Sequence, residues 1–150
     1  MPHYNPFQNL ELKIPESYRD AVGELSQTRP GGGAKPLPED SPFERQIDLW
    51  FLAICIGART KRRLPVSKKS HPFITGVTLA TDPGRIALLQ LLAISWTKDP
   101  WIIDKPSEII DLANNLAAAG LPELIEIMTH GKAKPMWALT DHITDIAGPQ

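Results

Sequence analysis

The residue types that most often carry catalysis or bind metals are few in this chain, and their spacing forms no catalytic motif. The histidines are His3, His71, His130 and His142. No two of them have the spacing that places two metal ligands on one helix face. His142 lies between Asp141 and Asp145, where a weak metal site is the alternative to a solvated histidine. The pattern predicts neither a metal nor a cofactor.

The sequence also gives little support for nucleophilic or acid–base catalysis. Cys55 lies within an apolar run, so we expect a small buried side chain and not a nucleophile. The carboxylate pairs are Glu108 with Asp111 and Glu123 with Glu126. Each pair lies near the start of a predicted helix, where the helix dipole favours negative charge without a catalytic role. We therefore expect no enzyme, and catalysis by His130 or His142 with nearby carboxylates is a less favoured alternative.

A cluster of positive charge is the strongest candidate for a functional site. Six of the 16 Lys and Arg residues lie between Leu49 and Thr81, whereas none of the 17 Asp and Glu residues does. The six are Arg59, Lys61, Arg62, Arg63, Lys68 and Lys69. His71 follows them and could contact a phosphate, although an ordinary loop histidine is the alternative. The charge is therefore segregated, even though the net charge is only −1.

Such a basic segment suits a negatively charged partner. Lys and Arg that neutralise phosphates give nucleic-acid binding its sequence-independent affinity, and a turn anchored on a rigid helix can hold them in place. We therefore predict that these six cations and His71 contact the backbone of a nucleic acid. An acidic protein surface is a second partner that fits the same charges. A solvated cationic loop without a partner is the non-functional alternative.

One apolar helix is expected before the basic segment and one after it. Ser41-Pro42-Phe43-Glu44 combines a capping hydroxyl, a proline at the first helical position and a glutamate three residues after the cap. This pattern predicts a helix that runs to about Ile56 and that Gly57 can end. Asp82-Pro83 repeats the start signal, so 85–96 is predicted as the next helix.

The remaining periodicity is also mostly helical. Further helical segments are expected at 16–26, at 106–119 before Gly120, at 122–130 and, more weakly, within 132–150. The β-branched residues of 73–79 predict one short strand. The expected fold is therefore mainly α, a compact helical domain of about five helices with one short extended or β segment near 72–79.

Length and composition indicate a single compact domain with an irregular front end. The chain has 150 residues, 42% of them hydrophobic, and seven of its 15 prolines lie at or before position 42. We predict an irregular N-terminal segment over 1–40 with a short helix and a Pro/Gly linker, a helical domain over 41–131, and a tail over 132–150 that docks on it. The single cysteine and the lack of a signal-peptide pattern or a long apolar run predict a cytoplasmic protein without a membrane partner.

The stretch from Ile47 to about Ile127 resembles a known bacterial family. The first half contains a helix that closes in Ile56-Gly57-Ala58-Arg59, the basic Lys61-Arg62-Arg63-Leu64-Pro65 and the Lys/Ser loop Ser67-Lys68-Lys69-Ser70. Pro72-Phe73-Ile74 follows, and then an apolar helix over 86–94 before Lys98-Asp99-Pro100. The last part is Ile109-Ile110-Asp111-Leu112-Ala113 before the turn Ala119-Gly120-Leu121. In order and spacing the stretch is similar to the DNA-phosphorothioation (Dnd) system-associated protein 4 family. Ser95-Trp96 departs from that pattern, in which a glutamate is expected in this helix.

The resemblance implies an accessory protein in bacterial defence or DNA modification, with larger protein subunits as partners, and it supplies no active site. Together with the basic segment, it predicts a non-enzymatic subunit that contacts nucleic-acid backbone. A protein–protein adaptor whose basic loop docks on an acidic partner is the main alternative. A homo-oligomer built on the strongly apolar helices around Trp50 and Leu91 is another.

Overall fold

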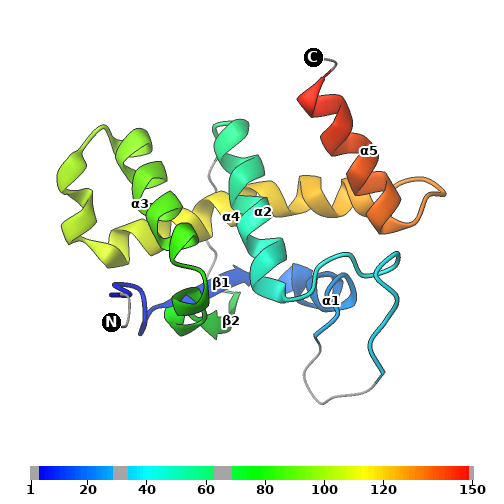
Figure 1. Ribbon diagram of the computed structural model, residues 1–150, viewed down its shortest axis with the longest axis horizontal. Helices are drawn as coiled ribbons and strands as arrows, with labels where there is room; N and C mark the ends of the chain where they lie inside the picture. Colours follow the sequence, from blue (N-terminus) through cyan, green and yellow to red (C-terminus); the bar gives the residue numbers. More distant parts are fainter. Residues whose placement is uncertain (1–3, 29–33, 63–68, 149–150) are drawn as a thin grey trace.

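The computed structural model describes residues 4–28, 34–62 and 69–148, and its fold is mainly helical, as predicted (Figure 1). The strands β1 (Glu11–Pro15) and β2 (Ser70–Thr75) pair antiparallel in a two-stranded sheet. The α-helices are α1 (Arg19–Glu24), α2 (Gln46–Arg59), α3 (Pro83–Thr97), α4 (Pro106–Thr129) and α5 (Pro135–Ala147). The short 3-10 helices are η1 (Glu16–Tyr18), η2 (Gly76–Thr81) and η3 (Pro100–Asp104). Within the described ranges, no helix has both the length and the apolar character needed to cross a bilayer.

Helices α2 and α4 form the centre of the molecule, where their backbones come into close contact (Figure 1). A Cβ atom at Gly57 of α2 would lie 2.2 Å from the carbonyl oxygen of Leu116 in α4. One at Gly120 of α4 would lie only 1.9 Å from the carbonyl oxygen of Ala53 in α2. The two helices can approach this closely because both positions lack a side chain.

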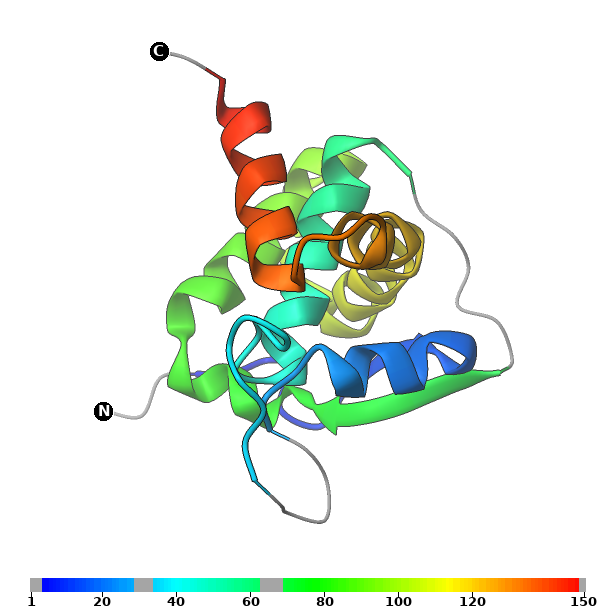
Figure 2. The ribbon, with the colours of Figure 1, turned by 90° about the vertical axis from the view of Figure 1, so that its right-hand side faces the viewer.

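The other elements surround this central pair. Figure 1 shows α3 and η3 towards one end of α4 and α5 at the other, with the sheet and α1 near the start of α2. Helix α5 projects from the body, with the C-terminus at its outer end (Figure 2), and none of its residues is buried. Its start is attached to the loop before α2, because the N–H of Met136 donates to the carbonyl of Glu39 at 3.1 Å.

Part of the N-terminal segment belongs to the core. Phe7 and Leu12 have no exposed surface and pack in the same apolar cluster as residues of α2 and α4. The buried amide of Asn114 in α4 accepts a hydrogen bond from the N–H of Lys13 at 2.8 Å and donates one to the carbonyl of Glu11 at 3.2 Å. The two bonds satisfy a buried amide and join β1 to α4 where the strand register shifts.

Helix α2 begins at Gln46, several residues later than its start signal predicts. The Ser41 hydroxyl donates to the carbonyl of Glu24 and does not cap the helix. Arg45 is the residue before the helix, and its backbone N–H donates to the Asp48 carboxylate at 3.1 Å. The predicted cap was wrong because the hydroxyl is used in a tertiary contact with the end of α1.

Glycines expected to end helices lie inside them instead. Gly57 is internal to α2, and both Gly120 and Pro122 are internal to α4, so the two helices predicted around Gly120 are one continuous helix. Packing between α2 and α4 decides these positions and overrides the local stop signal. The predicted strand lies earlier in the chain than expected, because β2 covers Ser70–Thr75, Thr75 pairs with Glu11, the first residue of β1, and η2 begins at Gly76.

Candidate nucleic-acid interface

The end of α2 carries the first part of the basic segment on a fixed backbone. Lys61 has a φ of 54°, in the left-handed region, and its N–H donates to the carbonyl of Ala58 at 3.1 Å. The N–H of Arg62 donates to the carbonyl of Gly57 at 2.9 Å. These two bonds form a Schellman motif, with lysine where glycine is most common. The motif fixes the backbone that presents Lys61 and Arg62.

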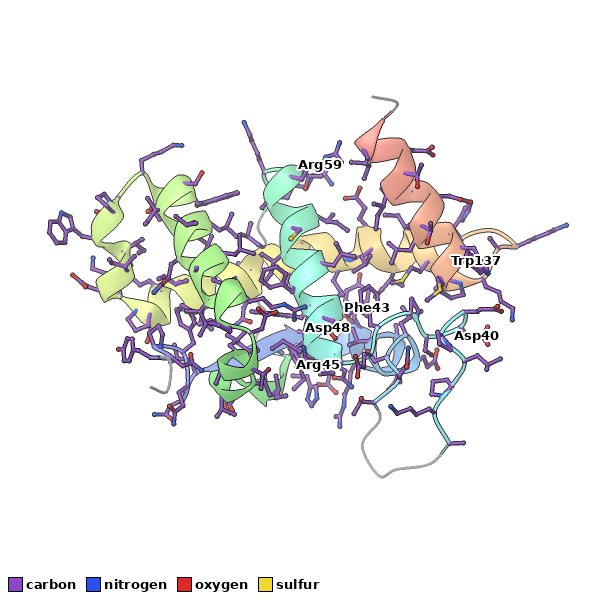
Figure 3. All side chains as sticks on the ribbon, in the orientation of Figure 1. Asp40, Phe43, Arg45, Asp48, Arg59 and Trp137 are labelled. Atoms are coloured by element: carbon purple, nitrogen blue, oxygen red, sulfur yellow. The ribbon has the colours of Figure 1, made fainter. Side chains whose placement is uncertain are left out.

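The side chains at this helix end are exposed. Arg59, Lys61 and Arg62 all belong to the exposed surface, and Figure 3 shows Arg59 at the opposite end of α2 from Arg45 and Asp48. Among the ion pairs that the described residues form with one another, none includes Arg59, Lys61 or Arg62. Three positive charges without a carboxylate partner in the described ranges therefore lie together. The negative end of the α2 dipole stabilises them there.

The second part of the basic segment lies where β2 begins. Lys69 is exposed, and its carbonyl accepts a hydrogen bond from the N–H of Glu16 at 2.8 Å. His71 is half-buried in β2, with its Nδ1 atom 3.8 Å from the Glu16 carboxylate. Arg63 and Lys68 lie outside the described residues. Figure 2 shows the end of α2 apart from the start of β2, so the described site residues form two groups.

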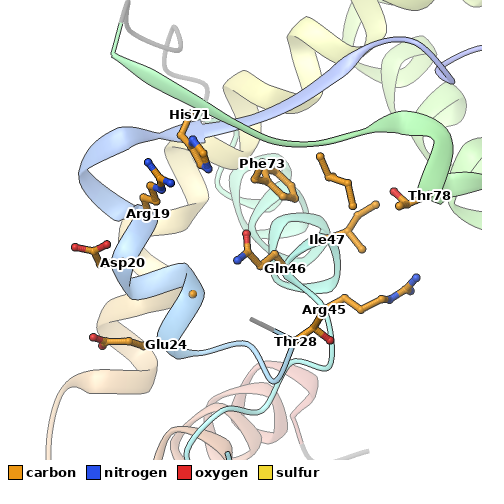
Figure 4. A pocket seen from close by; sticks show the side chains of 12 residues that line it. Arg19, Asp20, Glu24, Thr28, Arg45, Gln46, Ile47, His71, Phe73 and Thr78 are labelled. Atoms are coloured by element: carbon orange, nitrogen blue, oxygen red, sulfur yellow. The ribbon is translucent and has the colours of Figure 1, made fainter. Parts of the chain in front are cut away.

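A pocket of about 660 Å³ lies between α1, the start of α2 and β2 (Figure 4). Ile47, Phe73 and Ile74 provide apolar lining, and Arg19, Arg45, Gln46 and His71 provide polar groups. This volume is within the range of small-molecule sites. His71 therefore belongs both to the predicted nucleic-acid-binding residues and to the wall of this pocket.

Positive and negative groups are arranged unevenly around the pocket. Figure 4 shows Arg19 and His71 beside each other at one end, whereas the carboxylates of Asp20 and Glu24 point away from it. The guanidinium of Arg19 lies 3.4 Å from the Glu16 carboxylate, which thus contacts both the Arg19 and the His71 side chains. The end of the pocket formed by Arg19 and His71 is therefore the one at which an anionic group could be bound.

At the other end of the pocket, the charge of Arg45 is compensated within the protein. Asp48 accepts hydrogen bonds from Arg45 at 3.1 Å and from Arg85 at 2.7 Å. Burial alone would raise the pKa of Asp48, but the hydrogen bonds and charges of Arg45 and Arg85 outweigh it, and the pKa lies below its ordinary value. Arg85 also lies 3.1 Å from the Asp82 carboxylate and 5.0 Å from the centre of the Phe51 ring.

Cys55 is exposed and not buried as its apolar surroundings in the sequence predicted. It lies two residues before Gly57 and therefore on the side of α2 that faces away from α4. Partial burial raises the pKa of its thiol, while the charge of Arg85 opposes this effect. Within the described part of the chain, no three His, Cys, Asp or Glu side chains lie close enough together to hold a metal ion.

The pocket could not be predicted from the sequence. Arg19, Gln46 and Phe73 belong to three elements that are far apart along the chain and meet only in the folded protein. Of the pocket residues, only His71 was a candidate, because it follows the basic segment directly.

Comparison of the chain with protein-family models, with curated proteins and with solved structures finds no match. Its function is therefore inferred from the residues themselves and from their geometry.

Proposed function

We propose that this protein is a non-enzymatic accessory subunit that contacts the phosphate backbone of a nucleic acid through the end of α2. The observation that supports it is the group formed by Arg59, Lys61 and Arg62, which are exposed on a fixed helix end and have no carboxylate partner among the described residues. Phosphates that bind such cations release condensed counterions, and this release drives association. The family resemblance suggests a bacterial defence or DNA-modification complex as the setting.

Exposed apolar side chains support the subunit part of the proposal. Leu88 and Leu91 of α3 are 54% and 62% exposed, and Trp101 of η3 is 72% exposed. The single charged residue of α3 is Arg85, and its side chain is engaged by Asp48 of α2. The outer side of α3 therefore presents an uncharged apolar surface. Surfaces of this kind are typical of protein–protein contact sites.

Binding of a labelled DNA duplex tests the backbone contact. At about 50 mM salt, replacing Arg59, Lys61 and Arg62 together by glutamine should weaken binding about tenfold or more, because three phosphate contacts are lost. The matched control replaces three other exposed lysines, Lys35, Lys105 and Lys132, by glutamine. The control should weaken binding much less. Equal losses from both triple variants, or no binding by the wild type, would contradict the proposal.

The alternative function is an adaptor that docks on an acidic protein. The same three cations would then recognise carboxylates, whose interaction is also screened by salt. Affinity purification from the native host, with and without nuclease, separates the two functions. A partner protein that is retained after nuclease treatment, combined with no affinity for duplex DNA, would favour the adaptor.

A further inference from the structure

We propose that the pocket between α1, α2 and β2 accepts one unpaired nucleotide, with its base against Phe73 and its phosphate beside Arg19 and His71. This inference rests on the proposed function and specifies the form of nucleic acid that the protein prefers. The nucleotide could belong to a single strand or be a free mononucleotide, and the experiments below distinguish these two sources.

The apolar part of the pocket suits a flat aromatic ring. The half-buried Phe73 ring packs against the fully buried Trp50, with ring centres 6.3 Å apart and planes inclined by 57°. This contact holds the Phe73 ring in place, with Ile47 and Ile74 beside it in the lining. Stacking of a base on such a ring is tolerant of sequence, because every base has a π-face.

The polar groups near Phe73 suit the edge of a base. Figure 4 shows the Gln46 side chain between the Arg19 end and the Ile47 side of the pocket. A glutamine amide both donates and accepts hydrogen bonds, whereas the hydroxyl of Thr78, which also lines the pocket, donates to the carbonyl of Thr75 at 3.2 Å and is left with acceptor lone pairs. Together they offer both kinds of partner to the polar edge of a base, whichever base it is.

The anionic group of a nucleotide has one favourable end in this pocket. Arg19 and His71 lie beside each other, and their shared neighbour Glu16 is 3.4 Å from the first and 3.8 Å from the second. A phosphate there would compete with the Glu16 carboxylate for the Arg19 guanidinium and the His71 ring. Replacing Glu16 by glutamine removes this competing charge and should therefore strengthen binding of an anionic ligand.

The favourable end of the pocket lies next to Lys69, the described part of the basic segment at the start of β2. Lys69 is exposed one residue before β2, and its carbonyl is hydrogen-bonded to the N–H of Glu16, at the start of the η1–α1 unit that carries Arg19. A strand with a phosphate beside Lys69 would thus reach the pocket at the end where Arg19 and His71 lie. An unpaired nucleotide of that strand can enter the pocket, whereas a paired and stacked base cannot.

The first experiment compares two forms of DNA on the full-length protein. Labelled ten-nucleotide thymidine single strands and a duplex of the same length are titrated by fluorescence anisotropy at about 50 mM salt. The single strand should bind at least about fivefold more tightly, since stacking of one base is worth roughly that factor or more. Equal affinity for both forms would overturn the single strand as the source of the nucleotide and would leave the backbone contact intact.

Matched variants connect any preference to the pocket. Phe73→Leu keeps an apolar side chain but removes the stacking surface, so it should weaken single-strand binding about fivefold without changing duplex binding. Phe51→Leu is the control, because Phe51 is also a half-buried phenylalanine but lies outside the pocket. Should Phe73→Leu disturb folding, Gln46→Ala, with Gln90→Ala as its control, gives a second test. If neither pocket variant changes single-strand binding, no nucleotide of a strand enters the pocket and the single strand is excluded as its source.

Calorimetry with thymidine monophosphate and with inorganic phosphate tests the pocket alone. Thymidine monophosphate should bind more tightly than inorganic phosphate, and Glu16→Gln should increase its affinity. Binding of the mononucleotide without binding of any DNA strand would support the pocket and contradict the proposed function. Equal binding of inorganic phosphate and mononucleotide would show that no base is recognised, and no binding of strand or mononucleotide would overturn both proposals.

Discussion

Lys61 occupies a backbone position at which glycine is the most favourable residue. Its φ of 54° is in the left-handed region, and the hydrogen bonds of the Schellman motif hold it there. A side chain in this conformation costs free energy because its Cβ atom crowds the backbone. The chain accepts this cost and thereby keeps a third cation beside Arg59 and Arg62.

Replacing Lys61 by glycine should therefore stabilise the fold. The free energy of unfolding, measured by urea denaturation, should rise by about 1 kcal/mol because the Cβ atom is removed. Lys61→Ala is the control, since it removes the charge but keeps the Cβ atom, and it should bring no such gain. Equal stabilisation by both variants would show that charge, and not backbone conformation, determines the cost.

Asp48 joins two arginines that belong to different parts of the molecule. It accepts hydrogen bonds from Arg45, directly before α2, and from Arg85 in the first turn of α3. Because these partners outweigh the effect of burial, the pKa of Asp48 is lower in the folded protein than its ordinary value of 3.8. The carboxylate therefore stabilises the folded state when it is ionised.

Asp48→Asn should lower the free energy of unfolding by about 1–3 kcal/mol at neutral pH, as charged hydrogen bonds are lost. A depressed folded-state pKa gives stability that is present above 3.8 and disappears as the pH falls through the lower folded-state value. The difference between wild type and variant should thus shrink in acid. Asp111→Asn, on the exposed face of α4, is the control and should have little effect. A difference that stays constant with pH would contradict this role of the charge.

At the scale of elements, the crossing of α2 and α4 depends on two glycines. Gly57 and Gly120 each lie against the backbone of the facing helix, where a Cβ atom would overlap a carbonyl oxygen. Glycine is unfavourable inside a helix by roughly 1 kcal/mol relative to alanine. Close packing of the two central helices must therefore contribute more stability than these two positions cost.

Gly120→Ala should destabilise the protein by about 2 kcal/mol or prevent folding, because overpacking exceeds the gain in helix propensity. Gly23→Ala in α1 is the matched control, since nothing lies within 4 Å of a Cβ atom built there. That control should be neutral or stabilise by about 0.5–1 kcal/mol. Thermal unfolding of both variants by circular dichroism measures the contrast. A Gly120→Ala variant as stable as the control would mean that the helices do not cross at this distance.

Much of the helical architecture could be predicted from local sequence signals. The predictions that failed concern residues whose role depends on tertiary contacts. Pro83 and Pro106 begin α3 and α4, in agreement with the sequence-based prediction. The start of α2 could not be predicted, because Ser41 bonds to the end of α1 rather than to the helix. Gly120 resembled a helix stop because glycine often follows the last residue of a helix. The reason for a glycine here is the facing carbonyl of Ala53, which is far away in the sequence.

The candidate site was predictable to a similar extent. The cations at the end of α2 could be identified from charge segregation alone, because exposed Lys and Arg need no tertiary partner to be recognised. The pocket was not predictable, because Phe73 became part of it only through the pairing of β2 with β1 and its contact with Trp50. Asn114 was likewise hidden, since nothing local shows that an amide in an apolar helix binds the backbone of a distant strand.

At the scale of the whole molecule, three surfaces with different chemistry lie on different elements. The end of α2 is cationic, the pocket beside α1 and β2 is apolar with a cationic end, and the outer side of α3 is apolar and uncharged. Helix α5 adds the half-exposed Trp137, Ile143 and Ile146. This division fits a subunit that holds a nucleic acid with one part of its surface and a protein with another.

The salt dependence of duplex binding tests the central claim most directly. If the six cations of the basic segment neutralise four to six phosphates, the logarithm of the association constant should fall with the logarithm of salt concentration with a slope of about −4 to −5. The variant that lacks the charges of Arg59, Lys61 and Arg62 should show a slope shallower by about 3. Identical slopes for the variant and the wild type, or no binding of the wild type at low salt, would contradict a phosphate contact at the end of α2.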